Sequence, residues 1–225
     1  MLKRLFYKKS AFTLTELLIA LTILGAISAM TIPNLIEGLQ GRSLAAQLKS
    51  TYGDLQELAR EQMIAHNTKN LLDTDFASAD KLLTDKNFQI AKKCTSASEC
   101  WNQNYRSISK TSMDSRKTEG SPKTIILKNG QILSYQPSIL AYKIDGGKDR
   151  AIGLFYLDVN GTDKPNMMGR DVFWFYISEK GKVVDQYLAT GTTYNKTTAT
   201  NNCKTGSTIT GCFSVVMRNN WVFDF

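Results

Sequence analysis

Residues 8–35, KKSAFTLTELLIALTILGAISAMTIPNL, decide the fold of the N-terminal part of the chain and the location of the rest. From residue 12 to residue 32 the only ionisable side chain is that of Glu16. At about 1.5 Å per helical residue, a run of this length covers the roughly 30 Å of a bilayer's hydrocarbon core. The stretch therefore predicts a membrane-spanning helix with a carboxyl group near its cytoplasmic end.

The charge distribution predicts the orientation of this helix. Half of the formal net charge of +8 precedes it, on Lys3, Arg4, Lys8 and Lys9. By the positive-inside rule, the N-terminus stays in the cytoplasm and everything after Pro33 lies on the far side of the membrane. The basic residues of that larger part are interleaved with acids, whereas nucleic-acid binders cluster theirs. We therefore expect a single-pass membrane protein with an extracytoplasmic domain.

A secretory signal is the alternative for this stretch, because Ala26-Ile27-Ser28 before Ala29 fits a small-x-small cleavage site. The length of the apolar run and the acid inside it argue against that alternative. A buried acid costs about 2.5–3.5 kcal/mol at the centre of a membrane. Cleavage between Ala11 and Phe12 would create an α-amino group about one helical turn from Glu16. That amine, or the amine of a neighbouring copy, would neutralise the acid and make it an assembly device.

The sequence AFTLTELL at residues 11–18 resembles the N-terminal motif of type IV pilins and of type II secretion pseudopilins. These proteins have a basic leader, a small residue at the cut, Phe-Thr-Leu-x-Glu-Leu and a hydrophobic helix; Ala11 replaces the usual glycine. The resemblance implies that a prepilin peptidase removes residues 1–11 and that Phe12 becomes N-methylated. It also implies that helices 12–32 pack into a filament core, with Glu16 facing a neighbour's terminus. The implied partners are copies of itself, the peptidase, and an assembly platform with its ATPase.

The helix is expected to continue beyond the membrane through residues 33–66. Pro33, followed by Gly38 and Gly41, predicts a kink or a soft segment. Apolar residues then recur at spacings of three and four, which predicts an amphipathic helix to about His66. The residues of this apolar stripe are Leu44, Leu48, Tyr52, Leu55, Ala59 and Met63.

Residues 67–225 are predicted to form the globular part. Residues 67–121 show only short helical fragments, near 76–83. A hairpin is predicted at 124–135, because Asn129-Gly130 suits a type I′ turn. Further strands are expected at 151–159, 172–178 and 183–188, and a last hairpin is expected to join 213–217 to 221–225. The fold class is therefore α+β, a long helix packed on an antiparallel sheet, as the pilin resemblance also implies.

Four cysteines in an exported domain suggest two disulfides. Three pairings are possible, and the local one, Cys94 with Cys100 and Cys203 with Cys212, is favoured. A zinc site is disfavoured because neither spacing is a C-x2-C pair and His66 is far away in sequence.

Residues 158–171 place oxygen donors close together, at Asp158, Asn160, Asp163 and Asp171. They resemble a loop in the C-terminal part of many pilin-like proteins, and major pseudopilins carry calcium in this region. One interpretation is a calcium site. The other is a compact turn in which Asp158, Asn160 and Asp171 cap backbone N–H groups.

The sequence carries none of the common motifs for nucleophilic, phosphate or metal catalysis. We therefore expect no enzyme and no cofactor apart from the candidate calcium. The predicted function is a structural subunit of a type IV pilus or a type II secretion filament. Two alternatives stay open: a membrane-anchored binding module, such as one that captures DNA in competence, and a secreted hydrolase using carboxylates whose spacing the fold would set.

Overall fold

The computed structural model describes residues 13–109, 112, 122–137, 143–144, 149–185, 194–205 and 210–223, with the backbone alone at 33–37 and 143–144. The predicted cleavage and methylation site, Ala11 and Phe12, lies outside these residues. The chain divides into two compact units, Met1–Gln40 and Gly41–Phe225.

One long helix, α1, runs from Leu14–Ala65 over 52 residues. The predicted long N-terminal helix is therefore confirmed, to within one residue of its expected end. Its backbone is assigned as helical through Pro33, Gly38 and Gly41. The kink at these three residues stays a prediction.

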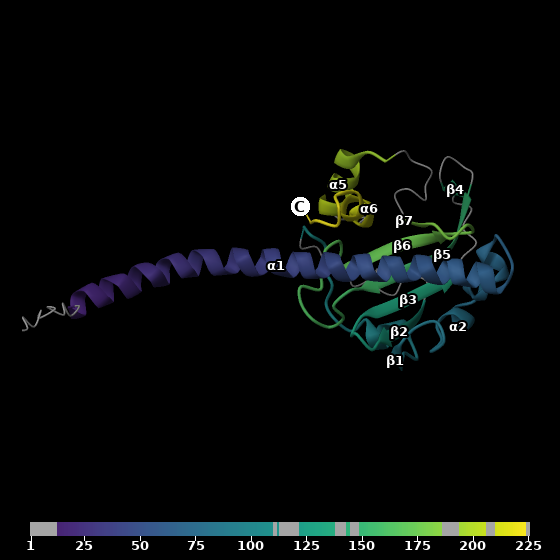
Figure 1. Cartoon of the computed structure of the whole chain (residues 1–225), viewed down its shortest axis with the longest axis horizontal. Helices are drawn as coiled ribbons and strands as arrows, with labels where there is room; N and C mark the ends of the chain where they lie inside the picture. Colours follow the sequence, from purple (N-terminus) through teal and green to yellow (C-terminus); the bar gives the residue numbers. More distant parts are fainter. Residues whose placement is uncertain are drawn as a thin grey trace, which may run out of the picture. The chain divides into compact units, whose positions relative to one another are not determined.

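The second unit is built on a seven-stranded antiparallel sheet, counted over the described residues. The strand order is β1-β2-β3-β5-β6-β7, and the short β4 pairs with β5. In Figure 1 the part of α1 after residue 41 runs across this sheet. The strands are β1 (Ile90–Lys93), β2 (Lys123–Leu127), β3 (Ile132–Pro137), β4 (Lys143–Ile144), β5 (Asp149–Asp158), β6 (Val172–Ser178) and β7 (Val183–Asp185).

Aromatic side chains form the centre of the core. The ring of Phe155 lies 4.6 Å from that of Tyr135 and 5.7 Å from that of Phe175, which in turn lies 5.0 Å from Phe213. Burying each such side chain is worth roughly 1.5–3 kcal/mol. The apolar stripe of α1 belongs to the same core: its members Leu44, Leu48, Leu55 and Ala59 are buried, and Tyr52 and Met63 pack against them. The predicted packing of the amphipathic half on the sheet is therefore confirmed.

The segment between α1 and the sheet consists of short elements. They are the 3-10 turns η1 (Leu71–Asp73) and η2 (Asp75–Ala77), and the helices α2 (Ala79–Leu82) and α3 (Ala97–Cys100). The oxygens of Asn70 and Thr74 cap the two turns by accepting hydrogen bonds from Leu72 N and Phe76 N. The predicted helical fragments near 76–83 correspond to η2 and α2.

The β2–β3 hairpin is present as predicted, but the prediction that its turn is of type I′ is wrong. That turn needs a positive φ at both central residues, whereas Gly130 has a φ of 88° and Asn129 a negative one. Gly130 N donates to Leu127 O and Leu127 N donates to Gln131 O, both at 2.9 Å. The connection is thus a three-residue loop that ends in a left-handed glycine. The Asn129 side chain accepts a hydrogen bond from Gln131 N at 3.1 Å, which explains the altered turn.

The hairpin predicted at 213–217 and 221–225 is also wrong. Residues of its first strand form a helix, α6 (Cys212–Arg218), which follows an unpredicted helix, α5 (Lys196–Thr205). The cause is a distant cap: the buried carboxylate of Asp185 accepts hydrogen bonds from Gly211 N at 2.9 Å and Ser214 N at 2.8 Å. It satisfies amides that a helix leaves unpaired at its start.

Candidate functional site

The first turn of α1 contains a reciprocal set of hydrogen bonds between Thr13 and Glu16. Thr13 N donates to Glu16 Oε2 at 2.9 Å, and Thr13 Oγ1 donates to the same oxygen at 2.7 Å. Glu16 N in turn donates to Thr13 Oγ1 at 3.2 Å. This arrangement is a capping box, which satisfies backbone amides that the helix start would otherwise leave unpaired.

The capping box gives Glu16 hydrogen-bond partners within its own chain. Thr13 supplies two donors to the carboxylate before any cut is made. The sequence contained the signal, because Thr-x-x-Glu ahead of an apolar run is the pattern of a capping box. Glu16 therefore marks the start of the helix.

The helix that follows is apolar on all its faces. Leu14–Ile32 has a mean hydropathy of 1.9, is long enough to cross a membrane, and has none of its residues buried in the protein. Its hydroxyls at Thr22 and Thr31 donate to Leu18 O at 2.7 Å and Ile27 O at 3.0 Å, so they present no free donor to a lipid. The large apolar side chains that stay more than half exposed are Leu14, Leu17, Leu18, Ile19, Leu21, Ile23, Leu24, Ile27, Met30 and Ile32.

The loop between β5 and β6 brings together two of the four predicted calcium ligands, Asp158 and Asp171, as buried carboxyl groups. Asp158 accepts hydrogen bonds from Tyr105 Oη at 2.8 Å and Asn160 N at 3.3 Å. Asp171 accepts from Asn166 N at 2.6 Å and Met167 N at 2.5 Å. Burial, reinforced by the neighbouring Asp171, raises the pKa of Asp158 to about 8. Burial likewise raises the pKa of Asp171 to about 6.

The other two predicted ligands take different positions. The Asn160 side-chain amide donates to the carbonyl oxygens of Asp163 and Lys164, while the side chain of Asp163 is exposed. In the part of the chain that the structure describes, no three acidic, histidine or cysteine side chains gather as a metal site would require. The bonds accepted by Asp158 and Asp171 are those of a turn that caps backbone N–H groups, and calcium binding stays a prediction.

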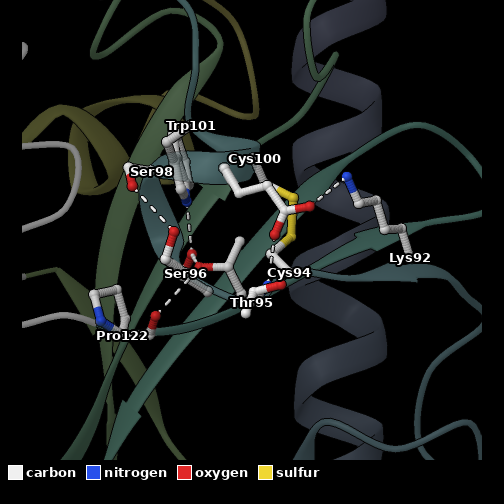
Figure 2. The surroundings of a disulfide bond; sticks show 11 residues. Lys92, Cys94, Thr95, Ser96, Ser98, Cys100, Trp101 and Pro122 are labelled. Carbon is white, nitrogen blue, oxygen red and sulfur yellow. Dashed lines mark hydrogen bonds and ion pairs between the residues drawn. A yellow bond between two sulfur atoms is a disulfide. The ribbon is translucent and has the colours of Figure 1, made fainter.

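Two disulfides join the local pairs Cys94–Cys100 and Cys203–Cys212. Because all four sulfurs are bonded in this way, they are not available to zinc. Figure 2 shows the first disulfide beside Trp101, whose indole N–H donates to Ser134 Oγ at 2.7 Å. On the solvent side, Glu99 accepts from Lys92 Nζ at 2.7 Å and from Thr95 N at 2.6 Å, and these bonds lower the pKa of Glu99 to about 2. The ion pair between Lys92 and Glu99 thus links α3 to β1.

Comparison with known proteins gives one finding for the N-terminal stretch. Residues 7–32 match the family model of the prokaryotic N-terminal methylation motif. No curated protein and no solved structure matches the chain.

Proposed function

The chain carries the prepilin motif of type IV pilins and pseudopilins, and from this premise we propose that it is a structural subunit of a type IV pilus or a type II secretion filament. The subunit would polymerise through residues 12–32. Its role is structural rather than catalytic.

The observation that carries the proposal is the solvent-exposed apolar surface of α1 within the matched stretch. Ten large apolar side chains between Leu14 and Ile32 are more than half exposed. Exposed apolar surface on this scale costs about 25 cal/mol for each Å² left in water. Lipid would cover it before assembly and the helices of other copies would cover it afterwards.

In the proposed cycle, a prepilin peptidase cuts between Ala11 and Phe12 and the new N-terminus of Phe12 is methylated. The amine then lies next to the Glu16 carboxylate, which already accepts two hydrogen bonds from Thr13. Because electrostatic attraction is stronger in a low dielectric, an amine from a neighbouring copy can fix the axial register between packed helices.

Before assembly, the protein would sit in the inner membrane with its N-terminus in the cytoplasm. The basic residues ahead of residue 12 favour this orientation. An assembly platform with its ATPase would then extract the subunit from the bilayer into the filament. The second unit, with its disulfides, suits the oxidising side of that membrane.

Mass analysis of the mature full-length protein tests the proposal. We expect an N-terminus at Phe12 that carries one extra methyl group. A chain that begins at Ala29 would establish the secretory alternative, and a functional chain that retains residues 1–11 would remove the proposed maturation.

A further inference from the structure

Opposite charges occupy the two exposed sides of α1 within the second unit. Arg42 and Lys49 lie seven residues apart, so they share one side, which we call the basic shoulder. Asp54 and Glu61 are also seven residues apart and share another side, the acidic shoulder. All four side chains are exposed. Within the described part of the chain, Arg42, Lys49 and Asp54 take part in no ion pair.

The two shoulders are related by a single displacement along the helix. Asp54 follows Arg42 by 12 residues, and Glu61 follows Lys49 by 12 residues. Two residues that are twelve positions apart in an α-helix are separated by about 18 Å along the helix axis. Their side chains also point in directions that differ by about 120° around that axis. One shift of a second copy therefore brings both basic residues level with both acidic ones.

The two shoulders lie next to different parts of the second unit. The acidic shoulder borders two adjoining grooves of about 360 and 390 Å³, which share Asp54, Leu58 and Asn87 in their walls. The basic shoulder lies toward α6, because Tyr52 on that side of the helix contacts Phe213 and Trp221. In Figure 1, α6 and α5 lie on one side of this part of α1 and β1, β2 and α2 on the other.

We infer that the basic shoulder of one copy docks on the acidic shoulder of another copy in the filament, which is a different neighbour from the one whose Phe12 amine meets Glu16. This inference rests on the proposed function, which inserts every copy into the membrane in the same direction and so makes neighbouring α1 helices parallel. Between parallel copies displaced by about 18 Å, Arg42 faces Asp54 and Lys49 faces Glu61. Because the two surfaces differ, the contact is heterologous, and repeating it extends an open helical array rather than closing a dimer.

Other charges near the acidic shoulder modify this contact. Glu57 lines the same groove but pairs with Arg60 of its own helix. Lys86 and Lys128 also line the grooves and reduce the negative potential there, but in the described part of the chain neither forms an ion pair with Asp54 or Glu61. The variants below leave Glu57 and Arg60 unchanged, so the pair within the helix is kept.

Charge reversal in the full-length chain tests the docking. Exposed ion pairs are individually weak, and losing two of them while adding repulsion should lower the assembled fraction roughly tenfold or more. We expect this loss for Arg42→Glu with Lys49→Glu, and separately for Asp54→Lys with Glu61→Lys. The four-position variant, which swaps both shoulders, should recover to within about threefold of the wild type. The matched control, Lys81→Glu with Lys204→Glu, makes the same charge change at exposed positions off α1 and should assemble normally.

Carbodiimide cross-linking gives a second measurement. Light and heavy isotope-labelled wild-type copies, assembled together, should yield mixed-isotope peptides that join Lys49 to Glu61. If wild-type copies assemble but the one-shoulder variants do so equally well, or if no such mixed peptide forms, the docking is wrong while the proposed function stands. If the wild type is processed at Phe12 yet never assembles, both are overturned.

Discussion

The two halves of α1 differ in what covers their apolar side chains. Between Leu14 and Ile32 the helix buries none of its apolar side chains, whereas Leu44, Leu48, Leu55 and Ala59 of the apolar stripe are 0–5% exposed in the core of the second unit. The second half has a partner within its own chain, and the first half needs one from outside. One continuous helix therefore has one half that is covered by its own unit and one half that is not, and substitutions in one half should leave the other half unaffected.

The sharpest way to separate the halves is Glu16→Ala. We expect the variant to insert in the membrane and its second unit to fold, while the assembled fraction falls by more than about tenfold, because the capping box and the intermolecular charge pair are both lost. Electron microscopy of sheared filaments, with membrane fractionation as the control, measures the two outcomes.

Substitutions of Thr13 divide the Glu16 effect into its parts. Thr13→Val removes the hydroxyl but leaves the carboxylate, so assembly should fall less than in Glu16→Ala. Thr13→Ser keeps the hydroxyl and should behave as wild type. Wild-type filaments from Glu16→Ala would remove the role given to the carboxylate.

A second prediction compares Phe155 with Leu21. Phe155 is fully buried between Tyr135 and Phe175, so Phe155→Ala should lower the free energy of unfolding of the second unit by about 3–5 kcal/mol. Leu21 is 57% exposed, and Leu21→Ala should change that free energy by less than about 0.5 kcal/mol. Guanidinium unfolding of the full chain in detergent, followed by tryptophan fluorescence, measures both. Equal losses would show that the halves do not act independently.

A further prediction is a pH dependence within the second unit, measured without metal. The pKa values of Asp158 and Asp171 are raised in the folded state, to about 8 and about 6. The folded protein therefore holds protons that the unfolded chain releases above about pH 4, and stability falls as the pH rises from about 4 to about 8. We expect a loss of at least about 1 kcal/mol over this range. Asp158→Asn should flatten the profile, and an unchanged slope in that variant would contradict the assignment.

The effect of calcium on the melting temperature gives a related prediction for the 158–171 loop. If the 158–171 loop binds this ion, millimolar calcium should raise the melting temperature at pH 8, where both carboxyl groups are more ionised, and have less effect at pH 5. Asp171→Asn should abolish the response. A melting temperature that does not respond to calcium at pH 8 would leave the loop as a capped turn.

Local patterns predicted much of the fold. The spacing of apolar residues predicted α1 and its buried stripe. Apolar and aromatic runs predicted β5 and β6, and Asn129-Gly130 between two apolar runs predicted the β2–β3 hairpin. The short separation of the cysteines favoured the two disulfides that the structure contains. These features are set by residues close together in sequence, which periodicity and turn chemistry describe well.

The errors arose where a distant residue decides the outcome. Residues 213–217 have a strand-like composition, but Asp185 caps them as a helix from 26 and 29 residues away. Asp158 likewise meets a distant residue, because its carboxyl group is buried and accepts a hydrogen bond from Tyr105, 53 residues away, which no local pattern predicts. At the N-terminus the pattern was local: Thr13 and Glu16 have the spacing of a capping box, but they were not predicted to form one.

The capping box has a consequence for maturation. Both of its residues lie on the retained side of the proposed cut, so trimming eleven residues would shorten the polypeptide without erasing the signal that starts its first helix. After cleavage the helix would still begin at the same residues, so its first turn would not have to form again. The new α-amino group of Phe12 would lie beside the Glu16 carboxylate, which Thr13 already holds in position.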